Sequence, residues 1–234
     1  MSESKWILHY WGGFVGRAEF VRLIFEEAGV PFENNSDHCE EWFRKGKCRF
    51  GEAGIFPSFA PPLLQKGSFY LSSTPAICKY LGKQFGFFPK SEEDQAHAEQ
   101  VNNAIHDYIG EARLAFHGVN HLASYFGQEK ETQVYIDRFI AERLMLWLKH
   151  FEAVLRHNKG GSGFVIGDTL TYVDLALLHI LRATEAQFPE QWKAAAADYA
   201  KLLNGFKARI SARPNLAAYL ASERCAKFSG NSMM

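Results

Sequence analysis

Residues 60–81, APPLLQKGSFYLSSTPAICKYL, constrain the fold more than any other stretch of the chain. The two consecutive prolines remove two backbone donors, so an extended segment that begins after them cannot continue backwards into a ladder. Leu63 and Leu64 lead into the turn QKGS, and residues 69–71 resume an extended apolar pattern. The sequence therefore predicts a β-hairpin whose first strand begins after a proline pair.

A helix start follows this hairpin. Ser72, Ser73 and Thr74 supply hydroxyl groups, and Pro75 follows them. With Thr74 as the N-cap, its side chain can accept a hydrogen bond from an unpaired backbone N–H, and Pro75 occupies the first helical position, where proline is tolerated. Free N–H groups and the helix dipole favour a carboxylate at such a position. The hairpin and the helix start together predict a clamp for an anionic ligand.

The composition narrows the class of protein. The chain has 234 residues, of which 47% are hydrophobic and 22% charged, as is ordinary for a soluble protein. Lys plus Arg and Asp plus Glu are both 26, so we expect no nucleic-acid partner. With no signal-peptide pattern and no run near about 18 apolar residues, we expect a cytoplasmic protein without a membrane partner. The four scattered cysteines favour neither disulfides nor a zinc site.

The N-terminal part alternates strand and helix patterns. Residues 5–10 are predicted as a strand, residues 17–28 as an amphipathic helix that ends at Gly29, and residues 30–32 as the next extended segment. This order is typical of a parallel strand pair with a crossover helix, to which the hairpin and its helix are added. Residues 34–58 are predicted as a long irregular region, a kind of loop that is usually functional or flexible.

Beyond residue 86 the pattern becomes helical. Apolar positions recur about every 3.6 residues from 131 to 157 and predict one long bundle helix. Thr171 and Asp174 have the spacing of a capping box at the start of another helix. The predicted helices after the linker cover residues 93–126, 131–157, 171–186, 189–209 and 214–221.

Both halves resemble the cytosolic glutathione transferases. The proline-bounded hairpin with its hydroxyl-capped helix resembles their thioredoxin-like domain, and the capping box at residues 171–174 resembles the start of a buried helix in their helical domain. The resemblance implies an α/β thioredoxin-like domain at residues 1–86, with a mixed four-stranded sheet, a linker at 87–92 and an all-helical bundle domain at 93–234.

The resemblance also implies an activity. We expect a homodimeric detoxification enzyme that adds the glutathione thiolate to hydrophobic electrophilic small molecules, with glutathione as co-substrate and with neither a cofactor nor a metal. A glutathione-dependent isomerase or peroxidase uses the same activated sulfur and remains an alternative. A non-catalytic ligand-binding or interaction module of the same fold is the other alternative.

Tyr10 is the candidate catalytic residue. Residues 8–11, LHYW, and 16–19, GRAE, resemble the start of the tyrosine classes (alpha, mu, pi and sigma). The junction WGGFVGR after Tyr10 holds no serine, threonine or cysteine, so a cysteine nucleophile is disfavoured. Lowering a thiol pKa by about 2 units corresponds to roughly 2.7 kcal/mol, and one hydrogen bond to a charged acceptor contributes about 1.5 to 3 kcal/mol. A neutral Tyr10 O–H donor is therefore sufficient; a tyrosine that only packs at the strand end is the alternative.

Four residues of the clamp are implied to bind glutathione. Ala60, which precedes Pro61, would pair its backbone with the cysteinyl part, and in the family the first of these prolines is cis. Ser73 and Thr74 would hold the γ-glutamyl end. Ser73 departs from the family, because many relatives carry Gln or Glu at this position.

Further binding residues are implied outside the clamp. Trp42 and Lys47 lie in the irregular region, where relatives hold the glycyl carboxylate with tryptophan and lysine, and Lys45 competes with Lys47 for this role. Asp107 stands where some relatives reach across the dimer to the γ-glutamyl ammonium group. An exposed helical aspartate is the alternative for Asp107.

Phe14 and Val15 are the candidates for the pocket of the second substrate. The chain has one residue more than is usual between Tyr10 and the following Gly-Arg pair, so the place of Arg17, in the loop or in the helix, is open.

His117 and His121 are four residues apart and could share a helix face as metal ligands. No third ligand has a suitable spacing, so we expect no metal site.

Overall fold

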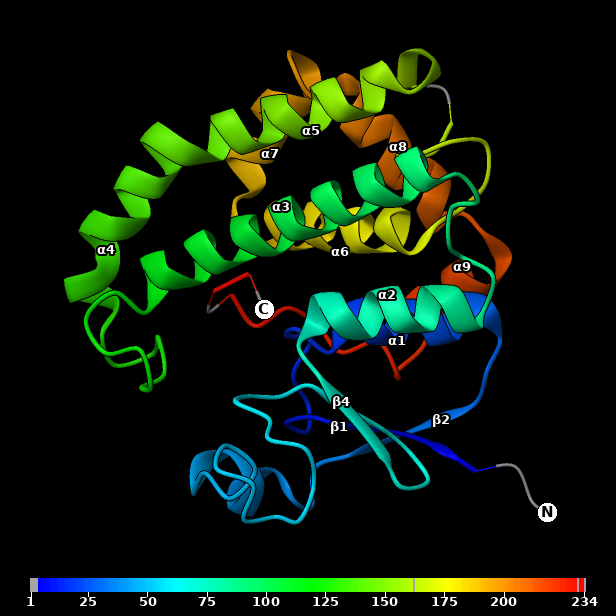
Figure 1. Cartoon of the computed structure of the whole chain (residues 1–234). Helices are drawn as coiled ribbons and strands as arrows, with labels where there is room; N and C mark the ends of the chain where they lie inside the picture. Colours follow the sequence, from blue (N-terminus) through cyan, green and yellow to red (C-terminus); the bar gives the residue numbers. More distant parts are fainter. Residues whose placement is uncertain (1–3, 162, 231, 234) are drawn as a thin grey trace.

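A four-stranded sheet lies at one end of the molecule (Figure 1), in a computed structural model that describes residues 4–161, 163–230 and 232–233. The strand order is β2-β1-β3-β4, with β1 parallel to β2 and antiparallel to β3, and β3 antiparallel to β4. The strands are β1 (Trp6–His9), β2 (Phe32–Asn35), β3 (Leu63–Lys66) and β4 (Phe69–Ser72). The predicted mixed sheet and hairpin are confirmed.

Two helices lie between the sheet and the helical part of the chain (Figure 1), and their apolar faces bind the two parts together. They are α1 (Glu19–Ala28) and α2 (Thr74–Gln84). Gly29 ends α1 in the left-handed conformation with a φ of 64°, as its position after the apolar pattern predicts. The segment between β2 and β3 is irregular except for a π-helical turn, η1 (Glu40–Arg44).

The remaining chain forms a bundle of helices. They are α3 (Glu92–Phe116), α4 (Glu129–Arg138), η2 (Phe139–Leu144), α5 (Met145–His157), α6 (Tyr172–Gln187), α7 (Pro189–Ala197), α8 (Lys201–Ser211) and α9 (Pro214–Leu220), with a 3-10 turn η3 (Lys159–Gly161) after α5. The long helix predicted at 131–157 is observed as α4, the π-helical segment η2 and α5 in one continuous run. No helix in the described ranges combines the length and apolar character that a membrane crossing needs.

Two predicted helix bounds are wrong. The helix predicted to reach residue 126 ends at Phe116, because His117 leaves the helical conformation and the Asn120 side chain accepts from the N–H groups of Leu122 and Ala123 in a turn. The helix predicted at 189–209 is interrupted at Asp198, whose ψ of −88° is not helical, so that α7 and α8 are separate.

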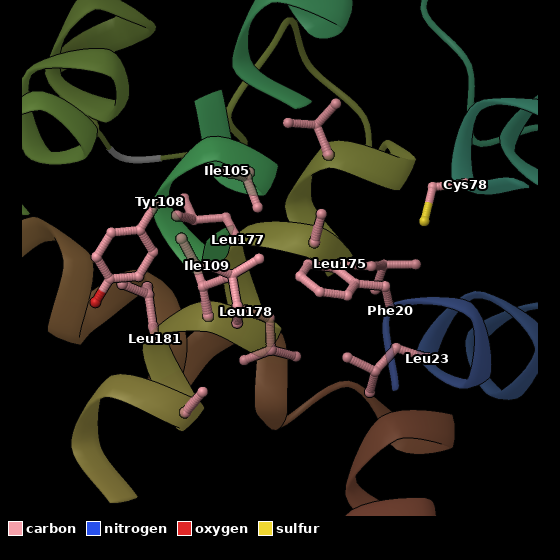
Figure 2. Close-up of a cluster of buried hydrophobic side chains, with 14 of the residues drawn as sticks. Phe20, Leu23, Cys78, Ile105, Tyr108, Ile109, Leu175, Leu177, Leu178 and Leu181 are labelled. Atoms are coloured by element: carbon pink, nitrogen blue, oxygen red, sulfur yellow. The ribbon is translucent and has the colours of Figure 1, made fainter. Parts of the chain in front are cut away.

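The core is centred on α6, most of whose side chains are buried. Figure 2 shows apolar side chains from α1, α2, α3 and α6 that meet in one cluster, among them Phe20, Cys78, Ile109 and Leu178. Gly82 on α2 is required for this packing, because a Cβ there would lie 2.9 Å from the ring of Tyr172. Burial of such side chains stabilises the fold by about 1.5–3 kcal/mol each, and it joins the sheet layer to the bundle.

The predicted capping box at the start of α6 is confirmed. One carboxylate oxygen of Asp174 accepts from the N–H and the hydroxyl of Thr171, at 2.7 and 2.8 Å, and the other accepts from the N–H of Val165 at 2.7 Å. Burial raises the pKa of the Asp174 carboxyl to about 6, so the group is mainly ionised at pH 7 and can accept all three bonds. The capping box therefore fixes both the helix start and the loop before it.

Candidate active site

Tyr10 directly follows β1, and its hydroxyl is held in place by the chain that leads into α1. The hydroxyl oxygen accepts a hydrogen bond from the Arg17 N–H at 3.0 Å. Gly16 has a φ of 49°, and a Cβ on it would lie 2.1 Å from this oxygen. Because the oxygen is the acceptor in the bond with Arg17, the phenolic O–H can donate to another group. Arg17 precedes α1, which begins at Glu19, so it is a loop residue.

The Tyr10 hydroxyl is neutral at physiological pH. Burial raises its pKa, and the hydrogen bond from Arg17 and the positive charges of Arg22, Arg17 and Arg113 offset this only in part. The guanidinium of Arg22 lies 5.9 Å from the centre of the Tyr10 ring. A neutral phenol is a hydrogen-bond donor, so Tyr10 is suited to stabilise an anion rather than to remove a proton.

Arg22 donates hydrogen bonds to the loop that follows Tyr10. Its Nη1 donates to the carbonyl oxygens of Phe14 and Val15, at 3.1 and 2.9 Å, and its Nε donates to the side chain of Asn34 at 3.0 Å. The same Nη1 lies 3.2 Å from the Glu19 carboxylate. These contacts of Arg22 were not predicted from the sequence, although the three-residue spacing of Glu19 and Arg22 on the buried face of α1 was a signal for them.

Glu19 connects the site to the bundle. Its carboxylate is fully buried and accepts from the hydroxyl of Tyr219, at 3.0 and 3.1 Å. Arg182 lies 3.6 Å from the same carboxylate. A buried carboxylate is stable only when it is paired and hydrogen-bonded, so the start of α1 is fixed from both α6 and α9.

The proline pair contains a cis peptide bond, but it joins Pro61 to Pro62. The prediction that the first proline is cis is wrong, because the sequence supplies two consecutive X–Pro bonds and does not distinguish between them. Pro62 is buried, Pro61 is half-buried and Ala60 is exposed.

The start of α2 is shifted by one residue from the prediction. Thr74 is the first helical residue and is buried, and Ser73 is the N-cap. Ser73 has a φ of 72°, which is rare for a residue other than glycine, and its side chain is exposed. Such backbone strain is concentrated at ligand clamps and active sites. The Ser73 side chain is therefore accessible at the start of α2, whereas the Thr74 side chain is buried.

The strand register brings these features to one edge of the sheet. His9 is opposite Leu63, and Leu63 is opposite Ser72. The residues that follow β1 and β4 and those that precede β3 therefore lie at the same edge. With strands about 4.8 Å apart, the backbones of Tyr10 and Ser73 are roughly 10 Å from each other.

Trp42 lies near this edge, on η1. Its ring centre is 4.5 Å from that of His38, in a stacked arrangement, and 5.0 Å from that of His9. Burial is the main cause that lowers the pKa of His9, so this ring is neutral at pH 7. The rings of His9, His38 and Trp42 therefore form an aromatic cluster beside β1.

The two candidate lysines share one partner. Lys47 lies 2.7 Å from the Glu41 carboxylate, and Lys45 also contacts it. Hydrogen bonds from Lys45 and Lys47 lower the pKa of Glu41 to about 2. Both lysines are exposed, so the structure does not distinguish between them. Asp107 lies exposed on α3, one turn before Gly110.

The candidates for the second pocket differ in their surroundings. A groove of about 260 Å³ lies beside Tyr10 and is lined by the loop after β1, the end of β2 and the segment after α9. Phe14 lines this groove and is 49% exposed, whereas Val15 is buried and does not line it. The groove residues are Tyr10, Trp11, Gly12, Gly13, Phe14, Arg22, Asn34, Asn35, Ser36, Glu223, Arg224 and Ala226.

The two histidines considered as metal ligands, His117 and His121, follow the end of α3. His117 is buried and bonds through Nδ1 to the carbonyl oxygen of Ala123, and His121 is exposed. Within residues 4–161, 163–230 and 232–233, no group of three His, Cys, Asp or Glu side chains is placed to hold a metal ion.

Known proteins are similar to this chain in sequence. Residues 116–223 match the family described as glutathione S-transferase, C-terminal domain. Glutathione S-transferase P of Bos taurus is 28% identical over 210 residues, which are 88% of each chain. Glutathione S-transferase P 1 of Xenopus laevis is 29% identical over 211 residues, which are 89% of this chain and 88% of the relative.

Solved structures agree over nearly the whole chain. A monomeric glutathione S-transferase of the hookworm Necator americanus superposes with a TM-score of 0.73 at 21% identity, covering 96% of this chain and all of the other. The glutathione S-transferase of Ascaris lumbricoides gives a TM-score of 0.66 at 25% identity, covering 93% of this chain and 96% of the other. The predicted fold class, a thioredoxin-like domain followed by a helical bundle, is confirmed. The chain is similar to glutathione S-transferases in sequence and in fold.

Proposed function

We propose that this protein is a glutathione transferase in which Tyr10 activates the thiol of glutathione. The observation that carries the proposal is the Tyr10 hydroxyl, which is neutral, held at 3.0 Å by the Arg17 N–H and free to donate its own proton. The thiol loses its proton to solvent, and the phenolic O–H donates to the resulting thiolate. The thiolate sulfur then bonds to the electrophilic carbon, and the leaving group departs with its electron pair.

The clamp would bind the tripeptide along the sheet edge. Ser73 and Thr74 would hold the γ-glutamyl end at the start of α2, where free N–H groups favour a carboxylate. Ala60 and Pro61 would face the cysteinyl backbone, and Pro61, which has no N–H, can only accept a backbone hydrogen bond.

The other assignments also stay proposals. Trp42 and Lys47, with Lys45 as the competitor, would hold the glycyl carboxylate, and Asp107 would act across a homodimer. Phe14 and Val15 remain the proposed neighbours of a hydrophobic electrophile, Phe14 with its side chain and Val15 as backbone support. We also propose a cytoplasmic location, glutathione as the co-substrate without a cofactor, and a division into residues 1–86, 87–92 and 93–234.

The test is the variant Tyr10→Phe, assayed by conjugation of 1-chloro-2,4-dinitrobenzene. We expect the rate at pH 7 to fall about 10- to 100-fold, because one hydrogen bond to a charged acceptor is lost. The deficit should shrink as the pH approaches about 8.5, where free glutathione supplies its own thiolate. Tyr80→Phe, on α2 and packed against Trp6, is the control and should keep the wild-type profile. If Tyr10→Phe keeps the wild-type rate and pH profile, Tyr10 is not the activating residue.

A further inference from the structure

Two arginine side chains lie near Tyr10, one from each part of the molecule, and the positive charges of both lower its pKa. Arg17 belongs to the turn before α1, and Arg113 to the last turn of α3. Nη2 of Arg17 lies against Gly110, since a Cβ on this glycine would be 3.7 Å from it. Arg113 follows Gly110 by three residues and shares its helix face. The absent side chain at Gly110 therefore lets Arg17 approach α3 beside Arg113.

This cationic pair lacks a counter-charge. Among the described residues, no carboxylate forms an ion pair with Arg17 or Arg113, whereas Arg22 and Arg182 both pair with Glu19. Burial is the main cause that lowers the pKa of Arg17, and the charge of Arg113 lowers it further. Two partly desolvated like charges cost free energy unless an anion binds between them.

The neighbouring groups of α3 do not supply that anion. His106 is buried, and burial lowers its pKa to about 3, so its ring is neutral. Burial also lowers the pKa of His117. Asp107, one turn before Gly110, is exposed and forms no ion pair with the described residues. Arg113 itself uses one N–H to bond the carbonyl oxygen of His121 at 2.9 Å, which leaves four of its five donors for a ligand.

A count of charges identifies the missing ligand. Tyr10 is neutral, so bound glutathione supplies one negative charge here, the thiolate, against two guanidinium groups. One positive charge remains, and a single carboxylate on the second substrate neutralises it. We propose that Arg113, together with Arg17, forms an anion-binding subsite and that the protein prefers electrophiles that carry a carboxylate. This inference rests on the proposed transferase function.

The test compares two substrates, 4-chloro-3,5-dinitrobenzoate and its methyl ester, which differ in charge and in one methyl group. Because the ester group activates the ring more strongly, each kcat/KM is divided by the rate constant of the uncatalysed reaction of the same substrate with glutathione, and the preference is the ratio of these two quotients. In both, the thiolate sulfur bonds to the aryl carbon, the C–Cl bond breaks and chloride leaves with the electron pair. At pH 7 and low salt we expect a preference for the carboxylate on this corrected scale. The preference should fall as salt is raised, because screening weakens the attraction.

Variants then assign this preference to Arg113. Arg113→Gln should reduce the carboxylate-to-ester ratio of kcat/KM about tenfold, because a charge-assisted contact is lost. Arg113→Lys, which keeps the charge, should keep most of the preference. Arg138→Gln removes the same charge at an exposed position on α4 and should leave the ratio unchanged.

Two results would overturn the inference while leaving the proposed function intact. One is a wild-type preference for the ester at low salt. The other is an equal loss for both substrates in Arg113→Gln with its fold kept by circular dichroism, because Arg113 would then only tether the loop at His121. Failure of the wild-type protein to conjugate glutathione with either substrate would instead remove the proposed function, and this inference with it.

Discussion

At the scale of single residues, Gly16 determines where the Tyr10 hydroxyl can lie. A Cβ on Gly16 would be 2.1 Å from the hydroxyl oxygen, so Gly16→Ala must displace Tyr10. We expect conjugation to fall about 100-fold, the scale of a displacement of about 1 Å at a reacting group, while glutathione-agarose still retains the protein. Gly13→Ala is the matched control, because Gly13 also has a positive φ, 77°, but open space around it. Equal losses in the two variants would show that backbone strain, not the clash, causes the effect.

Some residues near the candidate site can be identified from the sequence alone, and others cannot. Tyr10 can be singled out as a candidate because it is the only hydroxyl residue at a recognisable strand-to-helix junction. The interactions of Glu19 and Arg113 cannot be predicted in this way, because their partners lie far away in the chain. Glu19 accepts a hydrogen bond from Tyr219, and the positive charge of Arg113 acts on Tyr10. Only the fold brings such charges together.

At the scale of elements, the start of α6 depends on one carboxylate. Asp174→Asn replaces one of its two acceptor oxygens with a donor group, so at least one buried donor of Thr171 or Val165 is left unpaired. We expect the free energy of unfolding to fall by about 1–3 kcal/mol, measured by urea denaturation at pH 7. Asp168→Asn is the control, since Asp168 is exposed and forms an ion pair with Lys159 at the surface. An unchanged midpoint for Asp174→Asn would contradict the role of the capping box.

Elements differ in how well the sequence defines their ends. The start of α6 was predicted correctly because its cap is local, within four residues. The end of α3 and the break at Asp198 were missed because the apolar period continues through both, and the chain leaves the helix in response to packing and to turn hydrogen bonds. The start of α2 was misplaced by one residue because Ser73 takes a positive φ of 72°, which its residue type does not favour.

At the scale of the whole molecule, the proposed homodimer can be tested through the irregular region between β2 and β3. Phe50, Phe56 and Phe59 are 74%, 82% and 74% exposed there. Large exposed aromatic groups are typical of interfaces, and a second copy that covers them would bury about 1,200–2,000 Å² in total. The solved hookworm relative described as monomeric shows that the fold does not itself require a dimer.

We therefore expect a wild-type dimer by light scattering at micromolar concentrations, and a monomer when the three phenylalanines of this region are replaced by serine. Leu122→Ser is the control, because Leu122 is 97% exposed on the loop between α3 and α4 and should leave the mass unchanged. If Asp107 reaches glutathione across the dimer, the monomeric variant and Asp107→Ala should weaken glutathione binding to a similar degree, and combining them should add little, since both remove the same contact. A wild-type monomer throughout this concentration range would refute the dimer and leave Asp107 without a role at the site.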